Sequence, residues 1–121
     1  MTRQLPGGDM RGDRAPRTYT TGQWPHYAEP DASAPPGVHY SLALARALHD
    51  ATVQKNLSHR AASELAGLNA TAVGRIVRGE VYPDLATLAR LEVALRAPLL
   101  DRDLHRSVSA PAPAGTTERP E

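Results

Sequence analysis

The feature that most constrains this chain is a run of small, capping and apolar residues near its middle, between Ser58 and Asp84. Two helices that cross at roughly 90 to 120° need a small side chain where their axes approach, and a residue that tolerates positive φ at the turn. They also need apolar side chains facing inward on both helices. The residues that meet these demands in order are Ser63, Gly67, Leu68, Val73 and Ile76. The spacing therefore predicts two short helices packed across a tight turn.

The distribution of proline and leucine divides the 121 residues into a centre and two arms. Only two prolines lie between residues 38 and 110, whereas every leucine except Leu5 lies between Leu42 and Leu104. A leucine-rich middle flanked by Pro, Gly, Ser and Thr is typical of a folded domain with poorly ordered arms. We predict one domain over residues 38–106, a disordered N-terminal arm (1–37) and a disordered C-terminal tail (107–121).

The aromatic stretch from Trp24 to Tyr27 is the part of the N-terminal arm that could resist disorder. Its two large rings could dock on the domain. The surrounding Gly- and Pro-rich composition favours instead a solvated linker with a transient aromatic contact. Four arginines balance four acidic residues in residues 1–37, so no basic arm is evident there.

Periodicity and capping residues predict an all-α domain with five helices and no strand. Ser58 and Asn69 are placed to cap the second and third helices, and Asp84 to cap the fourth. The fourth helix has an expected inward stripe of Leu85, Leu88, Leu91 or Glu92, and Leu95. The helices are expected at about residues 39–55, 58–67, 69–78, 84–97 and 99–106.

Composition argues against several classes of site. The chain has no cysteine, which removes disulfides and thiolate metal sites. It has no segment typical of a signal peptide and no apolar run near 20 residues, so we expect a cytoplasmic protein without a membrane span. None of the five histidines pairs with another at i+4, and no set of nucleophile, base and carboxylate has the local context of an enzyme. We expect no metal, no cofactor and no enzymatic activity.

The second and third expected helices, together with the run from Arg78 to Glu92, resemble the Cro/C1-type helix-turn-helix of the XRE family of transcriptional regulators, in the form seen in actinobacterial members. The resemblance covers about residues 40–104. It implies a five-helix, lambda-repressor-like fold and sequence-specific binding of double-stranded DNA. It also implies that the helix at residues 70–78 enters the major groove, and that a homodimer binds an inverted repeat, with repression as the expected sense.

The resemblance assigns roles along the two helices. Ala70 and Thr71 would approach base edges, and Gly74 and Arg75 would face the groove floor. The guanidinium fork of Arg75 suits guanine, and Thr71 could donate to a base or present its methyl to thymine. The remaining candidates would contact the backbone or support a reader, and the full set of expected DNA contacts is Ser58, His59, Arg60, Asn69, Ala70, Thr71, Gly74, Arg75 and Arg78.

Two features keep a different interpretation open. Residues 38–106 carry nine Lys or Arg against seven Asp or Glu, which is a modest excess for a nucleic-acid binder. Ala70 and Gly74 also offer few hydrogen bonds, so specificity would depend partly on DNA shape. The alternative is a protein-interaction module, antitoxin-like or an adaptor, in which the helix-turn-helix is vestigial. Arg75 and Arg78 would then solvate an exposed helix face.

Overall fold

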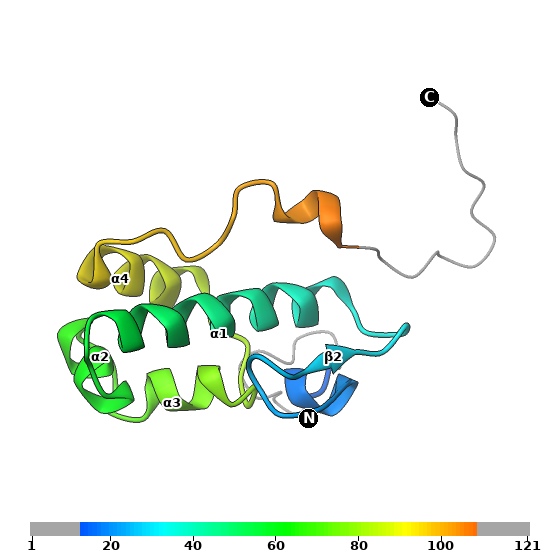
Figure 1. Ribbon diagram of the computed structural model, residues 1–121, viewed down its shortest axis with the longest axis horizontal. Coiled ribbons are helices and arrows are strands. Elements are labelled where there is room, and N and C mark those ends of the chain that lie inside the picture. Colours follow the sequence, from blue (N-terminus) through cyan, green and yellow to red (C-terminus); the bar gives the residue numbers. More distant parts are fainter. Residues whose placement is uncertain (1–12, 109–121) are drawn as a thin grey trace, which may run out of the picture.

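The computed structural model describes residues 13–108, and the disorder expected of residues 1–12 and 109–121 lies outside the described residues (Figure 1). The described chain is mostly helical. It contains four α-helices, two 3₁₀ turns and one small antiparallel sheet of two strands. The elements are η1 (Pro16–Tyr19), β1 (Thr20–Thr21), β2 (Glu29–Pro30), α1 (Pro36–Gln54), α2 (His59–Leu65), α3 (Ala72–Val77), α4 (Leu85–Leu95) and η2 (Leu104–Ser107).

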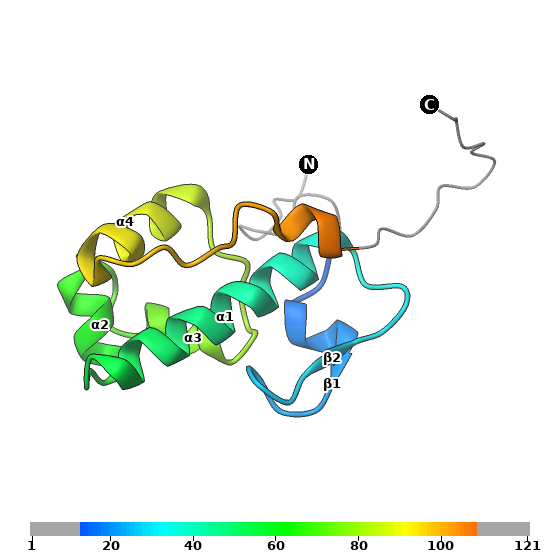
Figure 2. The same cartoon turned by 45° about the horizontal axis from the view of Figure 1, so that its top comes forward.

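Helix α1 runs through the middle of the fold, with α4 on one side of it in both views (Figures 1 and 2) and α3 on the other side in Figure 1. Leu44 and Leu48 on α1 are almost completely buried. They belong to one core that also contains Val73 of α3 and Leu91 and Leu95 of α4. Because each such leucine gains about 1.5–3 kcal/mol from burial, this core fixes how the three helices pack on one another.

The turn between α2 and α3 forms as the spacing predicts. The Ser58 hydroxyl accepts the N–H of Ala61 at 2.9 Å and so caps α2. Gly67 has φ of 73°, the left-handed conformation expected at the end of this helix. The N–H of Leu68 returns to the carbonyl of Ser63 at 2.9 Å, which closes the turn. Asn56 after α1 also has positive φ, as expected.

The expectation of a fifth α-helix is wrong, because the last element within residues 13–108 is a single 3₁₀ turn. Its hydrogen bonds join Leu104 N to Asp101 O and Arg106 N to Asp103 O, three residues apart. No residue of η2 is buried, so nothing compensates for the cost of nucleating a longer helix there. Leu85 also departs from expectation: it is 81% exposed and lies outside the core.

Residues 13–37 form structure where composition predicted disorder. Trp24 is only 9% exposed and packs with Ala28, Leu42 and Ala45 in a second small core against α1. The strands β1 and β2 pair with Thr20 opposite Pro30. Of the two rings that could dock, Trp24 therefore does so, whereas Tyr27 is 77% exposed. The prediction failed because the apolar partners of Trp24 on α1 become adjacent to it only in the folded chain.

No helix within residues 13–108 is both long and apolar enough to span a bilayer.

Candidate nucleic-acid interface

The relative tilt of α2 and α3 is fixed by a buried hydroxyl. Ser63 is completely buried where the two helices approach. Its Oγ donates to the carbonyl of His59 and accepts the N–H of Val73, each at 2.9 Å. Since an unpaired N–H would be costly at this depth, the hydroxyl satisfies a group at the start of α3 and holds that helix on α2.

The outer face of α3 is accessible at the positions expected to meet DNA. Thr71 is exposed, and the side chains of Arg75 and Arg78 are 52% and 56% exposed. Ala70 is half-buried just before the helix. The three exposed residues thus lie on the outer side of α3, whose inner side packs in the core.

Gly74 lies on the same face of α3 as Arg78, but it is buried rather than accessible. A Cβ placed on Gly74 would lie 3.0 Å from a terminal nitrogen of Arg78, so the guanidinium of Arg78 folds across this position. The absence of a side chain at Gly74 therefore leaves room for Arg78 to lie along the helix.

The beginning of α3 also differs from expectation. The helix starts at Ala72, and Asn69 closes a turn ahead of it. Asn69 Oδ1 accepts the N–H of Thr71 at 3.0 Å and its hydroxyl at 2.8 Å. Because the hydroxyl hydrogen of Thr71 is donated to Asn69, this side chain offers a partner only its oxygen lone pairs and its methyl group.

A carboxylate draws the basic side chains of this face together. Glu80 Oε2 accepts the Nε of Arg78 at 2.8 Å, and Glu80 Oε1 lies 3.6 Å from the Nε of Arg75. Arg17 reaches the same carboxylate at 3.5 Å from the N-terminal segment. The hydrogen bond from Arg78 is the largest cause that lowers the pKa of Glu80, and the charges of Arg17 and Arg75 add to it. Glu80 is therefore ionised at neutral pH and orders three guanidinium groups around it.

Sequence reasoning did not include Glu80 and Arg17 in the site. Glu80 follows Arg78 by two residues, so proximity along the chain could have indicated that pair. Arg17 lies 63 residues before Glu80, and nothing in the local pattern connects them.

Of the candidates at the start of α2, His59 lies near enough to Arg78 for the charge of that arginine to act on its ring. His59 is half-buried, and its ring packs edge-on against His49 at 5.8 Å between ring centres. Burial is the largest cause that lowers the pKa of His59, followed by His49 and by the charge of Arg78. Arg60 is mostly exposed and pairs with Glu64 at 3.1 Å.

Within residues 13–108, no three His, Cys, Asp or Glu side chains are grouped so that they could hold a metal ion.

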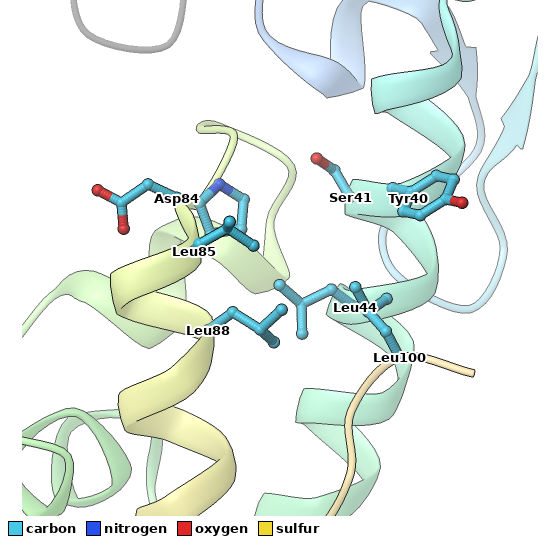
Figure 3. Close-up of a pocket in the computed structure, with 8 residues that line it drawn as sticks. Tyr40, Ser41, Leu44, Asp84, Leu85, Leu88 and Leu100 are labelled. Atoms are coloured by element: carbon cyan, nitrogen blue, oxygen red, sulfur yellow. The ribbon is translucent and has the colours of Figure 1, made fainter. Parts of the chain in front are cut away.

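Two hollows in the surface lie near these helices. One, of about 350 Å³, lies beside α3 and includes Thr71, Arg75 and Asp84 in its lining. The other, of about 150 Å³, lies between α1 and α4, where Leu44 and Leu88 point toward one another beside Leu100 (Figure 3). The second hollow contains none of the expected DNA contacts, and it is smaller than the 300–1,000 Å³ typical of small-molecule sites.

No family model matches the sequence, and no curated protein matches it. Among solved structures, the chain is similar to a hypothetical transcription factor NHTF from Neisseria, with a TM-score of 0.50 and 21% identity over 64% of this chain and 93% of that one. It is also similar to the restriction-modification controller protein C.AhdI from Aeromonas hydrophila, with a TM-score of 0.46 and 26% identity over 53% and 94% of the two chains. The likeness to the Neisseria structure shows a shared helical fold.

A third similar structure is an HTH_3 family transcriptional regulator from Vibrio cholerae, with a TM-score of 0.48 and 31% identity. The match covers 50% of this chain and 34% of that one, so this chain spans about a third of the length of the Vibrio protein.

Proposed function

We propose that this chain is a sequence-specific double-stranded DNA-binding protein that regulates transcription, with α3 inserted in the major groove. The observation that carries the proposal is the exposure of Thr71, Arg75 and Arg78 on one face of a helix whose other face is locked to α2 through Ser63. A rigid helix with an accessible polar face is the element that enters the major groove in helix-turn-helix proteins. The Neisseria protein that shares the fold is described as a hypothetical transcription factor.

Direct reading of bases is assigned to Arg75 and Thr71. The half-exposed guanidinium of Arg75 can leave Glu80, from which its Nε is 3.6 Å, and form paired hydrogen bonds with guanine O6 and N7. Such a pair contributes about 1–3 kcal/mol of discrimination against other bases. Thr71, whose hydroxyl already donates to Asn69, would accept a hydrogen bond from a base amino group or contact a thymine methyl.

The other candidate residues are assigned supporting roles. Arg78 and Arg60 are exposed cations and would contact phosphates. Gly74 would contribute through the room that it gives Arg78. The remaining backbone or supporting contacts in the proposal are Ser58, His59, Asn69 and Ala70.

We also propose that the chain acts as a homodimer on an inverted repeat, with repression as the expected sense. The outer face of α4 is the candidate surface for the second copy. Leu85 and Val93 are 81% and 78% exposed there, and the small side chain of Ala89 lies between them at the same helical spacing. Large exposed apolar side chains on one helix face are typical of a contact surface.

The test is a selection of bound sequences from random duplex DNA with the full chain, followed by footprinting at about 0.1 M salt. We expect one enriched motif whose two protected half-sites lie about one helical turn apart. If no sequence is enriched and no fragment is protected, the proposal is wrong.

A protein-interaction module remains the second candidate, because the same α4 face could bind a different protein. An exposed hollow of about 370 Å³, which includes Leu65, Ala89 and Val93 in its lining, runs along this face. A pull-down with and without nuclease separates the two candidates. A partner that is retained after nuclease treatment, together with no binding to any duplex, would favour the interaction module.

A further inference from the structure

The N-terminal segment is attached directly to the end of the proposed reading helix. The N–H of Arg17 donates to the carbonyl of Gly79 at 2.9 Å. The indole of Trp24 lies so close to Gly79 that a Cβ there would come within 2.6 Å of the ring. Gly79 follows α3 in the left-handed conformation, with φ of 72°. The N-terminal segment therefore packs directly against the residue that follows α3.

The same segment is held on α1, which fixes its position relative to α3. The Nε and one terminal nitrogen of Arg46 donate to the carbonyls of Pro25 and Ala28, each at 2.9 Å. The indole N–H of Trp24 donates to the hydroxyl of Thr20 at 2.7 Å. In Figure 1 the N-terminal turn and hairpin lie on the same side of α1 as α3, beyond the end of α3. Arg17 is thus presented by an ordered element.

Arg17 and Arg78 face a common hollow. This hollow has a volume of about 350 Å³ and is lined by Arg17, Gly22, Gln23, Trp24 and Arg78. The side chains of both arginines are 56% exposed. Three guanidinium groups share the single carboxylate of Glu80, so this end of α3 carries an excess of positive charge. An anion placed here would meet two guanidinium forks whose positions are already ordered.

We propose that residues 13–30 are a second DNA-binding element, in which Arg17, together with Arg78, binds a backbone phosphate of the duplex that α3 reads. The inference rests on the proposed function. When a helix lies in the major groove, its end approaches the sugar-phosphate backbone, and guanidinium groups are the side chains best shaped for phosphate oxygens. Arg17 would set the position of α3 in the groove and would carry no base preference of its own.

The test compares Arg17→Ala with the full-length wild-type chain on the duplex recovered by the selection. The substitution keeps the backbone bond from residue 17 to Gly79, and the lost side chain is more than half exposed. We expect the slope of log affinity against log salt to fall by about 1, and binding at 0.1 M salt to weaken by up to about tenfold. The sequence preference in a repeated selection should not change.

The matched control is Arg102→Ala, which removes the same charge from the exposed segment after α4. This segment lies across α1 from α3 (Figure 1). The control should leave the salt slope as in the wild type. Arg17→Lys keeps the charge and should restore most of the slope. Ethylation interference gives an independent measurement. Ethylation of a phosphate beyond the bases read by α3 should weaken binding by the wild type, and it should weaken binding by Arg17→Ala less, because only Arg78 then contacts that phosphate.

The outcomes separate this inference from the proposed function. If the wild type recovers no duplex, the proposed function fails and the inference fails with it. If the wild type binds and Arg78→Ala lowers the salt slope while Arg17→Ala leaves it unchanged, only the inference is overturned. A slope that falls with Arg17→Ala and is not restored by Arg17→Lys also overturns it, because the loss then comes from altered structure.

Discussion

The hydroxyl of Ser63 accepts the backbone N–H of Val73 at 2.9 Å, and this bond joins the middle of α2 to the start of α3. The same hydroxyl donates to the carbonyl of His59, so it acts both as a hydrogen-bond acceptor and as a donor within the protein. Ser63 is small enough for the crossing of α2 and α3, and its hydroxyl also orients α3, the helix that carries Arg75.

Replacing Ser63 by alanine should destabilise the protein by about 1–3 kcal/mol, because the Val73 N–H then loses its acceptor inside the core. Urea unfolding followed through the single tryptophan measures the change. Ser107→Ala, at an exposed hydroxyl in η2, is the control and should change the free energy of unfolding by less than about 0.5 kcal/mol. Equal effects of the two substitutions would contradict the role given to Ser63.

Gly79→Ala and Gly67→Ala form a matched pair, since the two glycines have φ of 72° and 73°. Each alanine adds the left-handed backbone cost of roughly 1–2 kcal/mol. At Gly67 the new Cβ would meet only the end of the Arg90 side chain at 3.3 Å, whereas at Gly79 it would meet the Trp24 ring at 2.6 Å. We expect Gly79→Ala to be the more destabilising and to change Trp24 fluorescence in the folded state. Similar free energies and an unchanged spectrum would show that Trp24 does not pack there in solution.

Arg46→Met should loosen the N-terminal segment while keeping an unbranched apolar stem on α1. The loss of two hydrogen bonds from a charged donor should cost about 1.5–3 kcal/mol locally. Limited proteolysis should then cut faster within residues 13–34, and Trp24 emission should shift to longer wavelength. Arg60→Met removes a more exposed arginine from α2 as the control, and should leave both measurements unchanged.

Arg75→Ala and Arg78→Ala should affect DNA binding in different ways. Loss of Arg75 should relax the preference at one base pair, at a cost of about 1–3 kcal/mol for the preferred sequence. Loss of Arg78 should weaken all sequences alike and lower the salt slope by about 1. Repeated selections and salt titrations distinguish these effects. If both substitutions leave binding unchanged, α3 is not the reading helix.

His59 makes stability depend on pH, because burial lowers its pKa from the ordinary value of 6.5. The folded state favours the neutral ring, so the unfolded chain binds more protons below about pH 6.5. This contribution to stability is present above pH 6.5 and is lost as the pH falls through the lowered pKa. We expect His59→Gln to flatten the dependence of unfolding free energy on pH in this window and to leave it parallel to the wild type above pH 7. If the curves of unfolding free energy against pH for the wild type and His59→Gln are parallel at every pH, His59 is not the cause of the pH dependence.

The sequence alone determined the parts of the fold that depend on neighbours along the chain. The cap at Ser58, the left-handed turns at Asn56 and Gly67 and the inward side of α3 at Val73 follow from signals within a few residues of each. Such signals act through backbone conformation and local hydrogen bonds, so a pattern of residue types is enough to predict them.

Only the tertiary structure decided the positions of Trp24, Arg17 and the guanidinium of Arg78. Trp24 and Arg17 meet partners more than 50 residues away, at Gly79 and Glu80, and these partners are close only after α1 and α3 have packed. The side chain of Arg78 covers Gly74, because Gly74 has no side chain in its way. A helical pattern of residue types does not indicate in which direction the Arg78 side chain lies. Contacts of this kind depend on the folded shape of the whole domain, because that shape brings together groups for which the local sequence carries no signal.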